Sequence, residues 1–289
     1  MTTGSTRPSA PEPLGARGAA ERGWAIDCWV NVNQGGTRDQ AFMQKVRETT
    51  FRNSPDFFRD MEPDALVAHM DEHRVEKCVI TIAVGVKNDR VLAFAERFPD
   101  RFALGCYVNP RNGMQELWDF EAMVASLPIV LAKVTPFMID LAPSAPEYWP
   151  VYAKCVELDL PIGINTGVPG PPKPADVQDP LHLDRPCIHF PELTVIMSHG
   201  ADPWWGMAIR LMRKYAGLHL MTSAWAPKYL PRELVDFMAS SRGQTKVLWA
   251  SDHPVLPMER CLADAAALGL PDDALGAYLH GNAQRLLFS

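Results

Sequence analysis

A histidine and an aspartate stand where two short apolar runs end, and together they are able to transfer protons. His199 closes the run 193–199, and Asp252 follows the run 246–251. A carboxylate that holds an imidazole is a common general acid or base near neutral pH. We therefore predict that His199 and Asp252 form a catalytic pair, with Asp252 setting the tautomer of His199. The alternative is that each side chain only satisfies the backbone of its own loop.

Four further side chains stand at the ends of other apolar runs and are candidates for binding a substrate. An indole offers a flat stacking surface, an amide offers a donor and an acceptor, and an ammonium suits a substrate carboxylate or a developing oxyanion. For the lysine, a solvated or ion-paired role is the alternative. The predicted substrate-binding residues are Trp29, Asn31, Lys133 and Asn165.

The segment 32–62 is longer than an ordinary loop, and long insertions in compact domains are often lids. Within it, Arg52 is predicted to bind a substrate anion through its fork of donors. An ordered surface excursion or a dimer contact is the alternative for this segment. Trp225, which follows a later apolar run, is predicted to line the rim of the same pocket.

These residues lie on a repeating pattern of β-rich runs and longer amphipathic stretches, which is typical of βα units on a parallel sheet. Eight such units most simply close into a (β/α)8 TIM barrel, whose active site is built at the carboxyl ends of the strands. Residues 23–289 are predicted to form this single barrel domain, and residues 1–22 a disordered tail. The predicted strands are 25–31, 77–84, 102–108, 129–134, 161–166, 193–199, 218–223 and 246–251, and the predicted helices are 63–73, 88–98, 114–126, 146–158, 203–215, 231–240, 258–268 and 272–287.

Composition excludes several classes of protein. The 289 residues are 47% hydrophobic and 21% charged, as in soluble globular proteins, and the net charge is −6. A negative chain does not attract nucleic acid or an anionic membrane, and no stretch reaches the roughly 18 apolar residues that a membrane span needs. We expect a cytoplasmic protein that acts on a small molecule, with a homodimer as an open alternative to a monomer.

Three stretches in a fixed order carry a resemblance to a known family: VIMSHG at 195–200, WASDHP at 249–254 and GNAQRLL at 281–287. In this order they resemble the amidohydrolase-related (amidohydrolase 2) barrel family, in particular the branch of aminocarboxymuconate-semialdehyde decarboxylase. The resemblance covers about residues 24–288. It implies a (β/α)8 barrel that hydrolyses or decarboxylates a small acid, usually with one divalent metal ion, commonly zinc. It also implies that His199 corresponds to the catalytic histidine of the family.

Most of the family's metal ligands are replaced. The family pattern Asp-x-His-x-His reads Asp-Cys-Trp-Val-Asn at 27–31, the histidine of the fifth strand is Asn165, and only Asp252 remains. An indole cannot bind a metal, and neutral amides are poor ligands for zinc. We therefore expect no metal cofactor. If an ion were retained, Asp252, His199 and Cys28 would hold it.

A second metal pattern occurs elsewhere. Residues 69–73 read HMDEH, which matches the HxxEH pattern of some zinc enzymes. The pattern falls on a helix that the barrel places on its outer wall, where Asp71 and Glu72 suit a solvated face. We therefore interpret it as a chance match.

The predicted function is a lyase of the decarboxylase, hydratase or cyclase type that acts on a small organic or aromatic acid without a catalytic metal. Such reactions need acid/base groups but no metal-activated hydroxide. A metal-dependent hydrolase is the first alternative, because the resembled family contains both classes. A non-catalytic binding protein that kept the barrel is the second.

Overall fold

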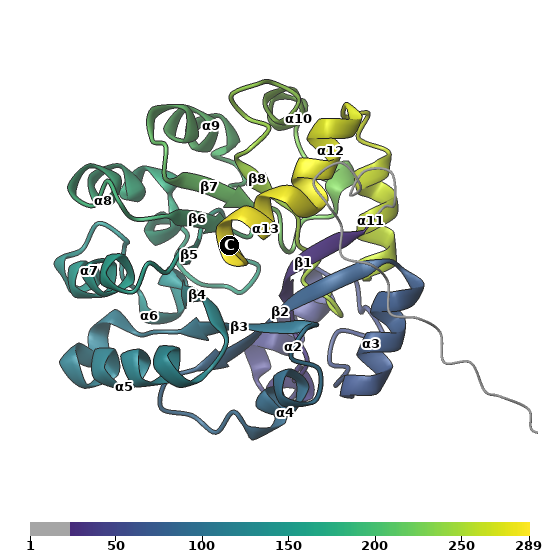
Figure 1. Ribbon diagram of the computed structural model, residues 1–289, viewed down its shortest axis with the longest axis horizontal. Coiled ribbons are helices and arrows are strands. Elements are labelled where there is room, and N and C mark those ends of the chain that lie inside the picture. Colours follow the sequence, from purple (N-terminus) through teal and green to yellow (C-terminus); the bar gives the residue numbers. More distant parts are fainter. Residues whose placement is uncertain (1–23) are drawn as a thin grey trace, which may run out of the picture.

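A computed structural model describes residues 24–289, which form an eight-stranded parallel barrel inside a ring of helices (Figure 1). The strands pair in chain order from β1 to β8, so the predicted (β/α)8 barrel is confirmed. The predicted tail, residues 1–22, lies outside the described residues. The strands are β1 (Ala25–Val30), β2 (Val75–Ala83), β3 (Phe102–Tyr107), β4 (Ile129–Val134), β5 (Ile162–Asn165), β6 (Val195–Ser198), β7 (Leu218–Met221) and β8 (Val247–Leu248).

Helices connect the strands, and no helix of the described residues is long and apolar enough to cross a membrane. The predicted helices are present, whereas three others were not predicted. The helices α6 and α8 are short and contain proline, and α2 lies in the segment 32–62, which was expected to be a lid or surface excursion. The helices are α2 (Ala41–Thr49), α3 (Pro63–Glu72), α4 (Asp89–Arg97), α5 (Gly113–Ser126), α6 (Pro136–Ile139), α7 (Trp149–Glu157), α8 (Asp184–His189), α9 (Trp205–Lys214), α10 (Arg232–Met238), α11 (Met258–Ala266), α12 (Asp272–Gly276) and α13 (Asn282–Leu287).

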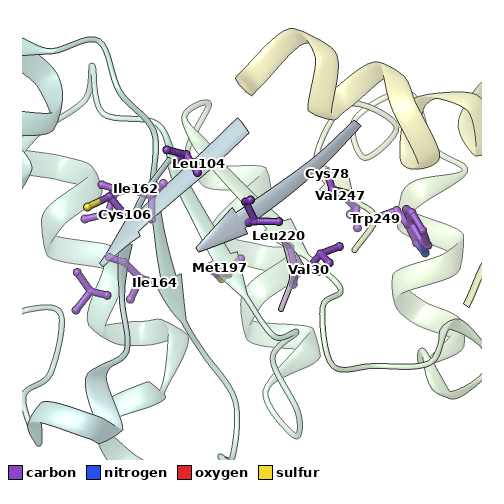
Figure 2. Close-up of a cluster of buried hydrophobic side chains, with 14 of the residues drawn as sticks. Val30, Cys78, Leu104, Cys106, Ile162, Ile164, Met197, Leu220, Val247 and Trp249 are labelled. Atoms are coloured by element: carbon purple, nitrogen blue, oxygen red, sulfur yellow. The ribbon is translucent and has the colours of Figure 1, made fainter. Parts of the chain in front are cut away.

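Apolar side chains form two layers, because successive residues of a strand point to opposite faces. One layer packs between the strands and the surrounding helices, and Figure 2 shows part of it, including Leu104, Ile162 and Met197. The other layer fills the inside of the barrel. Its members on the strands include Ile26, Val79, Leu131, Ile196 and Leu248, and Ala283 and Leu287 of α13 pack against them.

A buried carboxylate, that of Asp27, connects β1 to the segment after β8. We call this junction between the last and the first strand the seam of the barrel. Asp27 accepts hydrogen bonds from the backbone nitrogens of Ser251 (2.9 Å) and Trp29 (3.2 Å) and from the Ser251 hydroxyl (2.5 Å). The backbone nitrogen of Asn31 donates to the carbonyl of His253 (2.8 Å) and continues the seam. Burial raises the pKa of Asp27 to about 7, although its three donors oppose this shift.

The raised pKa of Asp27 predicts that the stability of the protein depends on pH. Between pH 4 and 7 the unfolded chain has an ionised Asp27 and the folded chain a protonated one, because the folded pKa lies above the ordinary value of 3.8. The stability of the wild type relative to Asp27→Asn is therefore expected to fall by about 1.4 kcal/mol per pH unit in this window, and to level off above it. Urea unfolding of both proteins at pH 5, 6.5 and 8 measures the difference. A difference that stays constant would contradict a protonated Asp27.

Candidate active site

A cavity of about 900 Å³ opens at the carboxyl ends of the strands. This is where the barrel topology places residues that follow the strands, because all eight run in the same direction. Five of the predicted site residues line it together, although they are far apart in the sequence: Trp29, Asn31, Asn165, His199 and Asp252. Trp225 also lines it, with its ring centre 5.5 Å from that of Trp205.

The segment 32–62 forms one wall of this cavity, mainly through apolar side chains. Phe42, Met43 and Val46 of α2 line it, together with Phe51 from the turn that follows. Arg52 does not line the cavity: its side chain is exposed. Its φ of 49° belongs to a turn after α2 that directs the side chain to solvent. The expectation that Arg52 binds the substrate is therefore corrected.

His199 is held by a serine that the sequence analysis missed. The Ser223 oxygen accepts the backbone N–H of His199 (3.1 Å) and lies 2.7 Å from its Nδ1. Because this oxygen already accepts one proton, its own hydroxyl can donate to Nδ1, which leaves the ring proton on Nε2. Burial, assisted by the charge of Lys133, lowers the pKa of His199 to about 3. The imidazole is therefore neutral at physiological pH. The signal that could have identified Ser223 is its place at the end of the predicted strand 218–223.

The pKa of Asp252 is shifted in the opposite direction, above its ordinary value. Its Oδ1 accepts a hydrogen bond from Asn31 Nδ2 (2.8 Å). Burial raises the pKa of Asp252 to about 7, and the charge of Asp27 adds to the rise, against the opposing effects of Asn31 and Lys133. The predicted hydrogen bond between Asp252 and His199 is not formed, since their partners are Asn31 and Ser223.

Both residues have strained backbones. The φ angles are 65° at His199 and 69° at Asp252, in the left-handed region that L-residues with side chains rarely adopt. Such strain costs about 1–3 kcal/mol per residue and concentrates at functional sites.

Lys133 lies beneath the floor of the cavity and does not line it. It is fully buried, its Nζ donates to Thr81 Oγ1 (2.5 Å), and Nζ lies 2.9 Å from the centre of the Trp29 ring. Burial lowers its pKa well below 10.5. Because Trp29 separates it from the cavity, the expectation that Lys133 binds the substrate directly is corrected. It places a cationic group under the indole instead.

Gly105 makes room for the stem of Lys133. A Cβ at this position would lie 2.6 Å from Lys133 Cδ, a distance that requires the lysine to move. We expect Gly105→Ala to lower the free energy of unfolding by about 1–3 kcal/mol through overpacking. Urea unfolding measures this, with Gly281→Ala as the control, since a Cβ there would meet nothing closer than 3.8 Å. Wild-type stability of Gly105→Ala would show that the Lys133 stem is not fixed here.

Two buried acceptors face the cavity without a partner. These are Oδ1 of Asn165 and Oε1 of Gln178, whose Nε2 donates to the carbonyl of Gly167 (2.6 Å). A buried polar atom without a hydrogen bond costs about 1–3 kcal/mol, so a donor on a ligand would be favourable here. Gln178 was missed by the sequence analysis because it lies in a proline-rich connection without a strand or helix pattern.

Cys28 faces the inside of the barrel but not the cavity. It packs with Ile26 and Leu248 in the inner layer, and its Sγ contacts the Ile26 carbonyl (3.9 Å). Strict alternation along β1 would place Cys28 and Trp29 on opposite faces of the strand. An irregularity in the pairing of β1 with β2 between Asp27 and Val30 breaks this alternation, so Cys28 and Trp29 both belong to the inner layer.

A family model for amidohydrolases matches residues 26–288. The chain belongs to the amidohydrolase family. The predicted amidohydrolase-like barrel enzyme is therefore confirmed at the level of the family. No curated protein was found to match the chain.

Solved structures share the fold of this amidohydrolase at low sequence identity. An uncharacterised TIM-barrel protein, Bb4693 from Bordetella bronchiseptica, is 22% identical, with a TM-score of 0.75 over 91% of this chain and 98% of that one. The 5-carboxyvanillate decarboxylase LigW from Sphingomonas paucimobilis is 16% identical, with a TM-score of 0.69 over 92% and 99%. A dihydroxybenzoic acid decarboxylase from Polaromonas is also 16% identical, with a TM-score of 0.69 over 92% and 97%.

Two findings overturn the expectation that this amidohydrolase takes no metal cofactor. The structure of the Polaromonas decarboxylase contains manganese. In the present chain, the side chains of His69, Glu72 and His73 bring ligand atoms within 4.8 Å of one another. Groups able to hold an ion are thus present, although not where the resemblance placed them.

The strand-end residues do not fit a metal ion. Trp29, Asn31 and Asn165 occupy positions where the family pattern has histidines, and Cys28 does not line the cavity. The remaining donors are Asp252 and His199, and each already has a hydrogen-bond partner. We therefore derive no catalytic step through a metal at this position.

Proposed function

We propose that this amidohydrolase decarboxylates a hydroxylated aromatic acid that also carries a sizeable apolar group. The observation that carries the proposal is the convergence of Asp252, His199 and Asn165 at the base of a largely apolar cavity. The fold shared with aromatic-acid decarboxylases supports the reaction class. A single scaffold hosts many reactions, so the site residues carry the argument.

The cavity walls indicate how such an acid binds. Among the described residues, no lysine or arginine lines the cavity. A carboxylate at its base would therefore exchange water for neutral donors, such as the N–H of His199. This environment disfavours the charged carboxylate, and so favours release of neutral CO2 as the electron pair of the broken C–C bond passes to the ring carbon. The unpartnered acceptors of Asn165 and Gln178 suit hydroxyl groups on the substrate.

Asp252 then supplies the proton. The carboxyl group transfers it to the ring carbon that bears the carboxylate, so a C–H bond forms while the C–C bond to the carboxylate breaks. Carbon dioxide leaves, and Asp252 regains a proton from solvent; the sum is RCO2⁻ + H⁺ → RH + CO2. Asn31 orients the carboxyl through its 2.8 Å hydrogen bond. A pKa of about 7 suits an acid that must be both protonated and regenerated near neutral pH.

The size of the cavity gives the second part of the proposal. Its volume of about 900 Å³ is near the upper end of the roughly 300–1,000 Å³ that drug-sized ligands occupy. A single substituted ring would leave much of the apolar wall from α2 exposed to water. A substrate with a second ring or an alkyl chain would cover this wall.

The role of Asp252 is tested by Asp252→Asn, which keeps the shape but cannot donate an acidic proton. Against a panel of hydroxybenzoates with aryl or alkyl substituents, we expect the wild type to release CO2 and the variant to lose about two to four orders of magnitude in kcat. The wild-type rate is expected to fall about tenfold per pH unit above pH 7, as Asp252 ionises. Full activity of Asp252→Asn on any substrate found would overturn this role. Tight binding by the wild type without turnover would favour the binding protein instead.

The apolar wall is tested by Met43→Gln, which introduces an amide of similar size on α2. We expect KM for an acid with the extra apolar group to rise about tenfold, which corresponds to about 1.4 kcal/mol. KM for a single-ring acid should not change. Steady-state kinetics of both substrates measure this, with Met114→Gln as the control because Met114 is exposed outside the cavity. Equal effects on both acids would contradict a separate subsite for the apolar group.

A further inference from the structure

Beside the cavity, a small pocket of about 240 Å³ lies against α3 and plays no part in the proposed reaction. His69 and Glu72 of α3 line it, together with His253. The ring centres of His69 and His73 lie 4.6 Å apart, one helical turn from each other. Glu259 of α11 places Oε2 at 3.3 Å from Nε2 of His69. The HxxEH pattern, interpreted from the sequence as a chance match on a solvated face, thus meets a carboxylate from another helix.

One buried imidazole nitrogen at this pocket, Nε2 of His253, has no hydrogen-bond partner, whereas Nε2 of His69 faces Oε2 of Glu259. His253 is only 6% exposed. Its Nδ1 accepts a hydrogen bond from the backbone nitrogen of Met258 (3.3 Å), so the proton of the neutral ring sits on Nε2. His253 is therefore a buried donor that lines the pocket without an acceptor, whereas Nε2 of His69 already faces a carboxylate oxygen.

We propose that His69, Glu72 and His73, whose ligand atoms lie within 4.8 Å of one another, bind a divalent transition-metal ion of the zinc type, and that Glu259, which lies beside His69, turns to join them. Imidazole and carboxylate are the ligands that zinc accepts outside thiolate sites. Histidines at i and i+4 lie on the same helix face, and the glutamate at i+3 lies beside them. In a tetrahedral site with bonds of about 2.0–2.1 Å, neighbouring ligand atoms are about 3.3–3.4 Å apart. The 3.3 Å distance between His69 and Glu259 matches this spacing.

The ion would connect two helices that flank the seam of the barrel. His69, Glu72 and His73 belong to α3 or its end, and Glu259 belongs to the first turn of α11. The Nε2–H group of His253 would remain available to an anion or water at the ion. Binding that is specific to the folded chain stabilises it, so a saturating ion should raise Tm by about 5 °C.

The test is Zn²⁺ binding to the full chain after dialysis against a chelator, measured by calorimetry and by elemental analysis. The informative variants are Glu72→Gln and His73→Gln on α3, and Asp252→Asn at the strand ends. Glu96→Gln is the matched control, because Glu96 is an exposed glutamate on the neighbouring helix α4. Circular dichroism verifies that each variant is folded, and Mn²⁺ is measured in parallel.

We expect one Zn²⁺ per wild-type chain and a rise in Tm. The affinity should fall at least tenfold in Glu72→Gln and in His73→Gln, and should be unchanged in Asp252→Asn and Glu96→Gln. Loss in Asp252→Asn with retention in both α3 variants would place the ion at the strand ends and overturn the proposal. Absence of binding by the wild type, or equal loss in Glu96→Gln, would overturn it as well. None of these readouts depends on turnover, so the proposed decarboxylation can fail independently.

Discussion

The contact between the Lys133 ammonium and the Trp29 ring is the interaction on which the arrangement of the site depends. A fully buried lysine is costly unless its amino group has partners. Here Nζ faces the Trp29 indole, lies 5.3 Å from the centre of the Tyr107 ring and donates to the hydroxyl of Thr81. Because Nζ lies 2.9 Å from the ring centre, the indole is fixed as the floor of the cavity. Gly105 is part of the same arrangement, since any larger residue would collide with the lysine stem.

Lys133 also affects the pKa values of His199 and Asp252, the two titratable groups above it, in different ways. The charge of Lys133 acts in the same direction as burial on His199, whose ring centre lies 4.4 Å from that of Trp29, and keeps the imidazole neutral. On Asp252 the same charge opposes burial, so the carboxyl remains near pKa 7. Groups whose environments push their pKa values apart are typical of acid/base sites. Here the carboxyl is the proton carrier, and the histidine is a neutral donor.

The segment after β8 connects the central cavity to the candidate metal site. Asp252 and His253 are neighbours in the segment after β8, but their side chains line different pockets. Asp252 lines the central cavity, and His253 lines the pocket against α3. An ion held by α3 and α11 would therefore stabilise the outer side of the segment that carries the proposed acid. At the strand ends, where the family pattern has histidines, the side chains are those of Trp29, Asn31 and Asn165, above the buried Lys133.

The sequence by itself determined the barrel and the set of residues at its mouth. Alternating short apolar runs and amphipathic stretches predict parallel strands with outer helices, and the common direction of the strands brings Asn31, Asn165, His199 and Asp252 to one end. These inferences succeed because strand periodicity and chain order are local properties. The predicted strand 246–251 is longer than β8, which ends at Leu248. The backbone N–H groups of Trp249 and Ser251 donate to Tyr278 and Asp27 instead of to a neighbouring strand.

Only the tertiary structure decided which of these residues interact. The irregularity in β1 places Trp29 over Lys133, and strict alternation along the sequence could not show it. Ser223 rather than Asp252 is the partner of His199, which the order of the segments along the chain does not show. The face of α3 that carries His69 and His73 meets α11 from a distant part of the chain. Such contacts depend on the relative rotation of packed elements, a property that no single segment of sequence contains.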